Sequence, residues 1–204
     1  MSAPSRPEVT LATTAEMKAI ALSLSDAFFD DPVMSWMLDD DASRGRRLAR
    51  LFGLLMRVHY LPLGTVWTTP ANEGAALWAP PGHAILPTPT ILRNSRAMLH
   101  ALGHRSIRAL RALSQVERLH PKEPHWYLGV LGTRTSLQGR GIGSAVLQPA
   151  LERCDEEGVP AYLESSKYSN IAFYGRHGFE VTGEIRLPRG GPTVWPMWRD
   201  PRPH

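Results

Sequence analysis

The chain has 204 residues, of which 43% are hydrophobic and 21% charged, with a formal net charge of +4. This composition is typical of a folded globular protein and excludes a disordered polymer or a fibre. A single cysteine, Cys154, excludes an internal disulfide, and without a cysteine–histidine cluster in the sequence we expect no metal site. No apolar run is long enough to span a bilayer, and residues 1–17 lack the apolar centre of a signal peptide. We therefore expect a cytoplasmic protein without a membrane partner.

The first part of the chain combines helices with a hairpin. Apolar residues at helical spacing predict helices over about 15–29 and 43–60. Residues 65–68 and 75–78 are short apolar runs on either side of a polar turn, which predicts a β-hairpin. Residues 80–89 contain four prolines and predict a loop.

The next segment, residues 91–119, predicts a helical insertion that bends near Gly103. It is rich in arginine, and a basic helix face can bind nucleic acid. Leucines such as Leu99 and Leu102 recur at the spacing of a core stripe, however, and basic residues opposite such a stripe are usually a solvated face. We therefore expect no nucleic-acid partner.

His100 and His104 have the spacing of a two-histidine metal site, but no third ligand lies nearby in the sequence, so we expect no metal there.

The last eighty or so residues alternate strands with helices. The expected strands are 126–132, 161–164, 179–185 and 193–198, and the expected helices are 142–157 and 170–176. Gly158 follows the longer helix at the position where helices commonly end. Neither a repeat nor a low-complexity linker divides the chain, so we expect one α/β domain.

The segment most informative about function is the turn before the helix over 142–157. Gly139, Gly141 and Gly143 occupy alternate positions there. Glycines leave the backbone N–H groups uncovered where the positive end of the helix dipole begins, so such a turn can bind a diphosphate. Arg140 and the Ser144 hydroxyl could add further donors.

A glycine-rich turn does not by itself specify a diphosphate site. It can be a tight strand-to-helix connection that binds nothing. A P-loop is excluded, because no Gly-Lys-Ser/Thr sequence follows the glycines. A dinucleotide-binding fingerprint fits the order of elements, with Glu164 as the acid that holds a ribose. Its glycine spacing is different, however, and residues 133–138 separate the strand from the first glycine.

Two motifs resemble one family. Residues 138–143 are similar to the Q/R-x-x-G-x-G/A signature of the GNAT superfamily of acetyl-CoA-dependent N-acetyltransferases. Residues 170–179 resemble the N-x-x-x-Y-x-x-x-G-F segment of the same family. The similarity is clearest over residues 120–199, where the chain resembles one member closely. Thr133 and Thr135 stand where the family usually has valine and proline.

The resemblance implies a single domain over residues 1–204, α/β of the α+β type. Its central sheet would be mixed, mostly antiparallel, splayed at the acetyl-CoA site and flanked by helices. Residues 1–119 would form the acceptor side and residues 120–204 the acetyl-CoA-binding side.

The resemblance also implies acetyl-CoA as cofactor and coenzyme A as product. Residues 138–144 would bind the pyrophosphate, and Leu131, Thr133 and Asn170 would hold the pantetheine arm. The residues expected to contact acetyl-CoA are Leu131, Gly132, Thr133, Gln138, Gly139, Arg140, Gly141, Ile142, Gly143, Ser144, Asn170 and Phe173.

Two residues are expected to carry the chemistry. By the resemblance, Tyr174 protonates the departing coenzyme A thiolate. Glu164, at a strand end, is our candidate for the base that deprotonates the amine, and His125 is the alternative. Cys154 has no identifiable activating base, so we expect direct transfer rather than an acetyl-enzyme.

The acceptor is expected to be a primary amine of a small molecule, bound by an aromatic wall with one acid. The candidate residues are Phe28, Asp31, Trp36, Trp78 and Tyr127. A protein N-terminus or lysine is the alternative acceptor, and a module that binds acetyl-CoA without turnover is the alternative to an enzyme. The sequence also leaves room for a homodimer.

Overall fold

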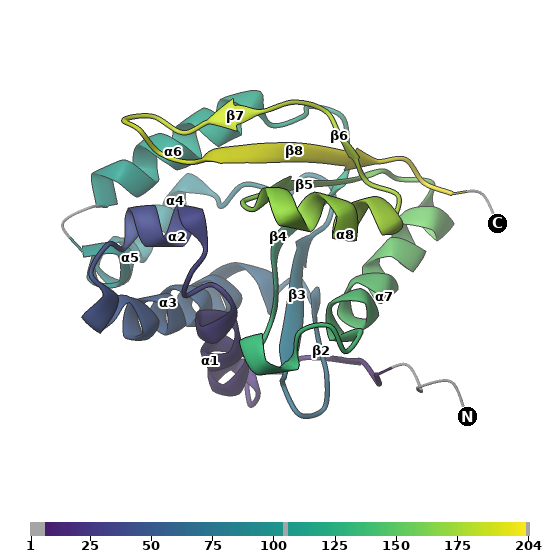
Figure 1. The fold of residues 1–204 in the computed structure, drawn as a ribbon, viewed down its shortest axis with the longest axis horizontal. Coiled ribbons are helices and arrows are strands. Elements are labelled where there is room, and N and C mark those ends of the chain that lie inside the picture. Colours follow the sequence, from purple (N-terminus) through teal and green to yellow (C-terminus); the bar gives the residue numbers. More distant parts are fainter. Residues whose placement is uncertain (1–6, 104–105, 203–204) are drawn as a thin grey trace.

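The computed structural model describes residues 7–103 and 106–202, with the backbone alone for 106–110, 112 and 113 (Figure 1). Its centre is an eight-stranded sheet in the order β1-β2-β3-β4-β5-β8-β6, with β7 also paired to β8. The strands are β1 Thr10–Leu11, β2 Val66–Thr68, β3 Gly74–Ala79, β4 Trp126–Thr133, β5 Ala161–Ser165, β6 Glu180–Val181, β7 Ile185–Arg186 and β8 Thr193–Arg199. Among these strands β4 and β5 pair in parallel and the other pairs are antiparallel, which confirms the expected mixed sheet.

Helices cover both faces of this sheet. The helices are α1 Met17–Ala27, α2 Pro32–Met37, α3 Asp41–Leu55, α4 Thr88–Arg93, α5 Ser95–Leu102, α6 Ser106–Leu119, α7 Ile142–Glu157 and α8 Ile171–Arg176. A π-helical turn, Met56–Tyr60, extends α3. Figure 1 shows α1 to α3 on one side of β3 and β4, and α7 on the other.

Each face of the sheet has its own core. On the α1–α3 face, Ile20, Leu24 and Phe52 pack with Leu77. On the α7 face, Val146 and other helix residues pack with strand residues such as Leu163 and Trp78. Burial of this apolar surface holds both layers of helices against the sheet. The splayed strands described below lie between the two cores.

The hairpin and the long helix before Gly158 are where the sequence predicts them. The expected strand over 179–185 is wrong: it is two short strands, β6 and β7, which pair with different parts of β8. Pro196 lies between those two parts, and proline has no N–H to continue a ladder of hydrogen bonds.

The helical insertion over 91–119 consists of α4, α5 and α6, and Gly103 caps α5 with a φ of 62°. Leu102 packs against the core, as expected for a core stripe. Leu99 does not, since it is 54% exposed. The other residues of the expected stripe, Ile107, Leu110 and Leu113, belong to the part of α6 whose side chains are not described.

Among the described residues, no helix combines the length and the apolarity needed to span a membrane. Within the same residues no three side chains of the ligand-forming types gather as they would around a metal ion. His104, considered above with His100, lies outside the described residues.

Candidate active site

The site lies where two neighbouring strands separate. β4 and β5 pair in register only from Trp126–Ala161 to Leu128–Leu163, although β4 continues to Thr133. Beyond Leu128, β4 keeps its antiparallel pairing with β3 and diverges from β5. The edge of β4 that turns away from β3 can therefore form hydrogen bonds with a ligand, as an exposed strand edge does.

A bulge in β4 marks the point of separation. Leu77 pairs with Val130 and Trp78 with Leu128, so Gly129 is an extra residue in β4. Bulges bend a strand and change the direction of its side chains. A Cβ atom at Gly129 would be 2.0 Å from the hydroxyl of Tyr60, which explains why glycine occupies this position.

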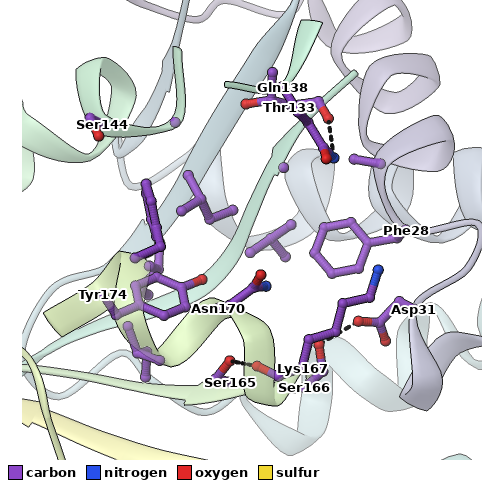
Figure 2. A pocket seen from close by; sticks show the side chains of 18 of the residues that line it. Phe28, Asp31, Thr133, Gln138, Ser144, Ser165, Ser166, Lys167, Asn170 and Tyr174 are labelled. Carbon is purple, nitrogen blue, oxygen red and sulfur yellow. Dashed lines mark hydrogen bonds between the residues drawn. The ribbon is translucent and has the colours of Figure 1, made fainter. Parts of the chain in front are cut away.

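A cavity of about 540 Å³ fills the gap between the diverging strands. Its walls come from β4, β5, the end of α1, the glycine-rich turn and α8 (Figure 2). A volume of this size is in the range of sites that bind small ligands or cofactors.

The glycine-rich turn borders the cavity with its donors free. Gly139 and Gly141 have φ angles of 78° and 81°, which favour glycine, and a Cβ at either position would meet open space. Gly141 is the N-cap of the 16-residue helix α7, and no side chain caps that end. Uncapped N–H groups at a helix start bind anions, so the turn fits a diphosphate.

Eleven of the twelve residues expected to contact acetyl-CoA line this cavity. They are Leu131, Gly132, Thr133, Gln138, Gly139, Gly141, Ile142, Gly143, Ser144, Asn170 and Phe173. Arg140 does not line the cavity and is exposed to solvent. The Ser144 hydroxyl lies 2.9 Å from Nε2 of His177.

Tyr174 enters the cavity from α8. The residue is 8% exposed and packs in the α7-side core, and Figure 2 shows its hydroxyl directed toward Asn170. Burial raises the pKa of this phenol, and the nearby Asp31 carboxylate raises it further. The phenol is therefore protonated at physiological pH and can donate a proton.

Glu164 reaches the cavity from the opposite face of the sheet. Leu163 packs in the α7-side core, and side chains alternate along a strand, so Glu164 faces the α1–α3 side. Its Oε2 accepts a 2.9 Å hydrogen bond from the Tyr127 hydroxyl, and its Oε1 is 3.5 Å from Nδ1 of His120. The carboxylate and the Tyr174 phenol thus approach one cavity from two sides.

The five candidate acceptor contacts divide into two groups. Phe28 and Asp31 line the cavity. Asp31 already accepts hydrogen bonds from the backbone N–H groups of Val33 and Met34 and from the Ser166 hydroxyl. Its charge therefore caps α2 and anchors the loop after β5.

Trp36, Trp78 and Tyr127 do not line the cavity, contrary to expectation. Trp78 is fully buried in the α7-side core, because its position in β3 turns it toward α7. Trp36 packs against a small cluster that includes Leu187. Tyr127 contacts the lining indirectly, because its hydroxyl donates a hydrogen bond to Glu164, which does line the cavity.

The loop after β5 lines the cavity and was not predicted. It contributes Ser166, Lys167 and Ser169, next to Ser165 at the end of β5, and Figure 2 shows Lys167 reaching toward Phe28. A run of polar residues at the carboxyl end of a parallel strand is a common ligand-binding position, and this signal is present in the sequence.

Comparison with known proteins finds several that are similar to this chain. The family model "Acetyltransferase (GNAT) family" matches residues 95–179. An uncharacterized N-acetyltransferase of Schizosaccharomyces pombe is 29% identical over 190 residues, which is 88% of this chain and 76% of that protein.

Two solved structures have a similar fold. One is the Corynebacterium glutamicum protein named "histone acetyltransferase HPA2 and related acetyltransferase", with a TM-score of 0.74 and 28% identity over 97% of this chain and 98% of that one. The other is arylalkylamine N-acetyltransferase 2 from Aedes aegypti, with a TM-score of 0.64 over 97% of this chain and 100% of that one. The latter is 11% identical, so it shows a shared fold alone.

Proposed function

We propose that the chain, which is similar to the GNAT family of acetyl-CoA-dependent N-acetyltransferases, is a member of it and acetylates a primary amine of a small molecule by direct attack in a ternary complex. The observation that carries this proposal is the continuous cavity from the uncapped glycine turn to the gap between β4 and β5. Tyr174 and Glu164 both line it, on opposite faces of the sheet.

The chain's own residues fit acetyl-CoA. The N–H groups at residues 139–144 would bind the pyrophosphate, and the free edge of β4 at Leu131 and Thr133 would hold the pantetheine arm, with Asn170 opposite. When bound, acetyl-CoA supplies an activated thioester carbonyl. Tyr174 would give its proton to the departing thiolate.

The amine must lose a proton before it can attack. For an amine of pKa about 10.4, deprotonation at pH 7 costs roughly 4.6 kcal/mol, whereas an amine of pKa about 7.8 needs only about 1 kcal/mol. Glu164 would accept that proton from the acceptor side of the cavity. Cys154 is unsuited to an acetyl-enzyme, because it is buried in the α7-side core and burial raises the pKa of its thiol to about 12.

A small acceptor is supported by the modest volume of the cavity. Residues 120–124 and 191–195 resemble puromycin N-acetyltransferase, which makes an aminonucleoside amine the first acceptor to test. The Corynebacterium glutamicum protein carries a histone acetyltransferase name. A lysine peptide is therefore the matched alternative.

Calorimetric titration with acetyl-CoA tests the cofactor, with NADH and ATP as controls. We expect acetyl-CoA to bind with micromolar affinity and the two controls not to bind.

Thiol release is then measured with puromycin, an arylalkylamine, a diamine and a lysine peptide at equal concentration. Turnover with a small amine supports the proposal, and turnover with the peptide alone overturns the small-molecule acceptor. Binding without any turnover favours a non-catalytic module, and preference for NADH overturns the cofactor assignment.

A further inference from the structure

A cluster of titratable side chains lies next to Glu164 and outside the cavity lining. His120 directly follows α6, and His125 directly precedes β4. Their Nε2 atoms are 2.9 Å apart, and Nδ1 of His120 is 3.5 Å from Oε1 of Glu164. Both rings are buried: the His120 side chain is 9% exposed and His125 is 5% exposed.

Hydrogen bonding determines which nitrogen of each ring carries a proton. Nδ1 of His125 is 2.6 Å from the backbone carbonyl oxygen of Glu123, and a carbonyl can only accept, so this nitrogen carries the proton. Burial lowers the pKa of His125, so the ring is neutral and its Nε2 is a bare acceptor. Nε2 of His120 must therefore be the donor in the 2.9 Å contact.

The same reasoning leaves Nδ1 of a neutral His120 free to accept a proton. The atom opposite it, Oε1 of Glu164, is buried and has no hydrogen-bond partner among the described residues. The two atoms are 3.5 Å apart, so a proton bound to Oε1 is within reach of Nδ1. A proton that arrives at Glu164 thus has a defined next position.

We infer that His120 takes the amine proton from Glu164 and that His125 is a positioning residue, which holds His120 in the form with hydrogen on Nε2. This inference rests on the proposed role of Glu164 as base. One N–H bond of the ammonium breaks and an O–H bond forms on Glu164. The O–H bond then breaks as an N–H bond forms on Nδ1 of His120, which restores the carboxylate and leaves an imidazolium.

The relay helps most with strongly basic amines. In peptides a glutamic acid has a pKa of about 4.3 and an imidazole about 6.5, so moving the proton to an imidazole improves the equilibrium by roughly 100-fold. An amine that is mostly neutral at pH 7 gains little from it. The helical insertion ends at Leu119, directly before His120, so it places this proton acceptor at the site.

The tyrosines around the pair stay neutral over the working range, whereas the charge of the nearby Glu123 side chain favours the protonated ring of His125. Tyr127 and Tyr162 pack edge-on against His120 at 5.0 Å between ring centroids. Burial raises the pKa of both phenols, and the Glu164 charge adds to this. Burial raises the pKa of Tyr60 as well. These phenols therefore do not contribute to the pH dependence between about 5 and 9.

The test compares His120→Gln and His125→Gln with His100→Gln, an exposed histidine on α5. The rate constant kcat is measured from pH 5 to 9 with amines of increasing pKa. For His120→Gln we expect kcat at pH 7 to fall roughly 10- to 100-fold with an amine of pKa about 10, and about twofold or less with one near 7. His125→Gln should show a smaller loss of the same kind. KM for acetyl-CoA should not change, and His100→Gln should match the parent protein.

Two further results separate this inference from the proposed function. If Glu164→Gln is inactive while His120→Gln loses the same factor with every amine, or nothing, the relay is wrong and Glu164 remains the base. Full activity of Glu164→Gln overturns both the base and the relay. Imidazole ¹⁵N chemical shifts of the parent protein give a readout without turnover: we expect hydrogen on Nε2 of His120 and on Nδ1 of His125. The opposite form of His120 overturns the inference.

Discussion

Two tyrosines close together in the sequence have opposite environments. Tyr174 is 8% exposed and lines the cavity, whereas Tyr168, on the preceding turn, is 71% exposed. Because burial keeps the Tyr174 phenol protonated, it can serve as a proton donor, while Tyr168 is available to solvent. The pair therefore separates a chemical role from the general effect of losing a tyrosine hydroxyl.

We expect Tyr174→Phe to lower kcat by about 100-fold, the lower end for loss of a general acid, with little change in acetyl-CoA affinity. Tyr168→Phe, the matched control, should leave both unchanged. Thiol release measures kcat, and calorimetry measures affinity. Unchanged turnover in Tyr174→Phe would remove this residue from the mechanism.

The glycine turn offers a second matched pair. Gly141 and Gly82 have φ angles of 81° and 80°, and a Cβ at either would meet open space. Aspartate at both positions should therefore impose the same backbone strain, about 1 kcal/mol. Gly141→Asp also places a carboxylate where we propose the pyrophosphate binds. We expect it to weaken acetyl-CoA binding by about 100-fold or more, with Gly82→Asp unaffected.

Calorimetry and thermal unfolding are measured on both variants. Equal losses of stability with unequal losses of affinity support the diphosphate site. Tight acetyl-CoA binding by Gly141→Asp would show that the phosphates bind elsewhere.

At the scale of elements, the bulge in β4 couples the strand to the π-helical turn that carries Tyr60. Gly129→Ala would bring a methyl group to 2.0 Å from the Tyr60 hydroxyl oxygen and 3.1 Å from Cζ. We expect this overpacking to lower the free energy of unfolding by about 1–3 kcal/mol. Tyr60→Phe removes the oxygen, so the double variant should lose less than the sum of the two single variants.

Urea unfolding of the two single variants and the double variant gives the coupling energy. Gly183→Ala is the control, since a Cβ there meets nothing within 4 Å, and it should stay within about 0.5 kcal/mol of the parent protein. Additive losses for Gly129 and Tyr60 would mean that the strand moves away instead of pressing on the ring.

At the scale of the whole molecule, the features that depend on a few neighbouring residues could be predicted from the sequence. The glycines before α7 and the stop at Gly158 could be predicted, because a helix start and end depend on a few neighbouring residues. Which aromatic residues line the cavity could not. The side to which Trp78 points depends on the pairing of β3 with β4 across a bulge, and the sequence does not encode that register locally.

The position of His120 depends on an even longer range of the chain. The insertion α4–α6 returns to the sheet beside β5, and only then does the imidazole meet Glu164, 44 residues further along the chain. No motif spans that separation. Long-range contacts of this kind are the part of the site that required the structure.

An ion pair joins distant parts of the chain in the same way. Both nitrogens at the end of Arg199 donate 2.8 Å hydrogen bonds to Asp155, and Nε of Arg199 donates to the His177 carbonyl. The bonds to Arg199 hold the pKa of Asp155 below its usual value, outweighing the opposite effect of burial. The folded protein therefore binds this proton less readily than the unfolded chain, so the pair stabilises the fold above a pH of about 3.9 and that stability is lost as the pH falls further.

We expect Asp155→Asn to lower the free energy of unfolding at pH 7 by about 2–3 kcal/mol, because Arg199 is 3% exposed and would lose its charged partner. Glu156→Gln, an exposed acid one residue along α7, should change it by about 0.5 kcal/mol or less. Urea unfolding is measured at intervals from pH 7 to pH 3. The difference between Asp155→Asn and the parent protein should shrink below a pH of about 3.9, where the unfolded chain binds the Asp155 proton before the folded protein does. A difference that stays constant over that range would assign the loss to packing around the side chain and not to its charge.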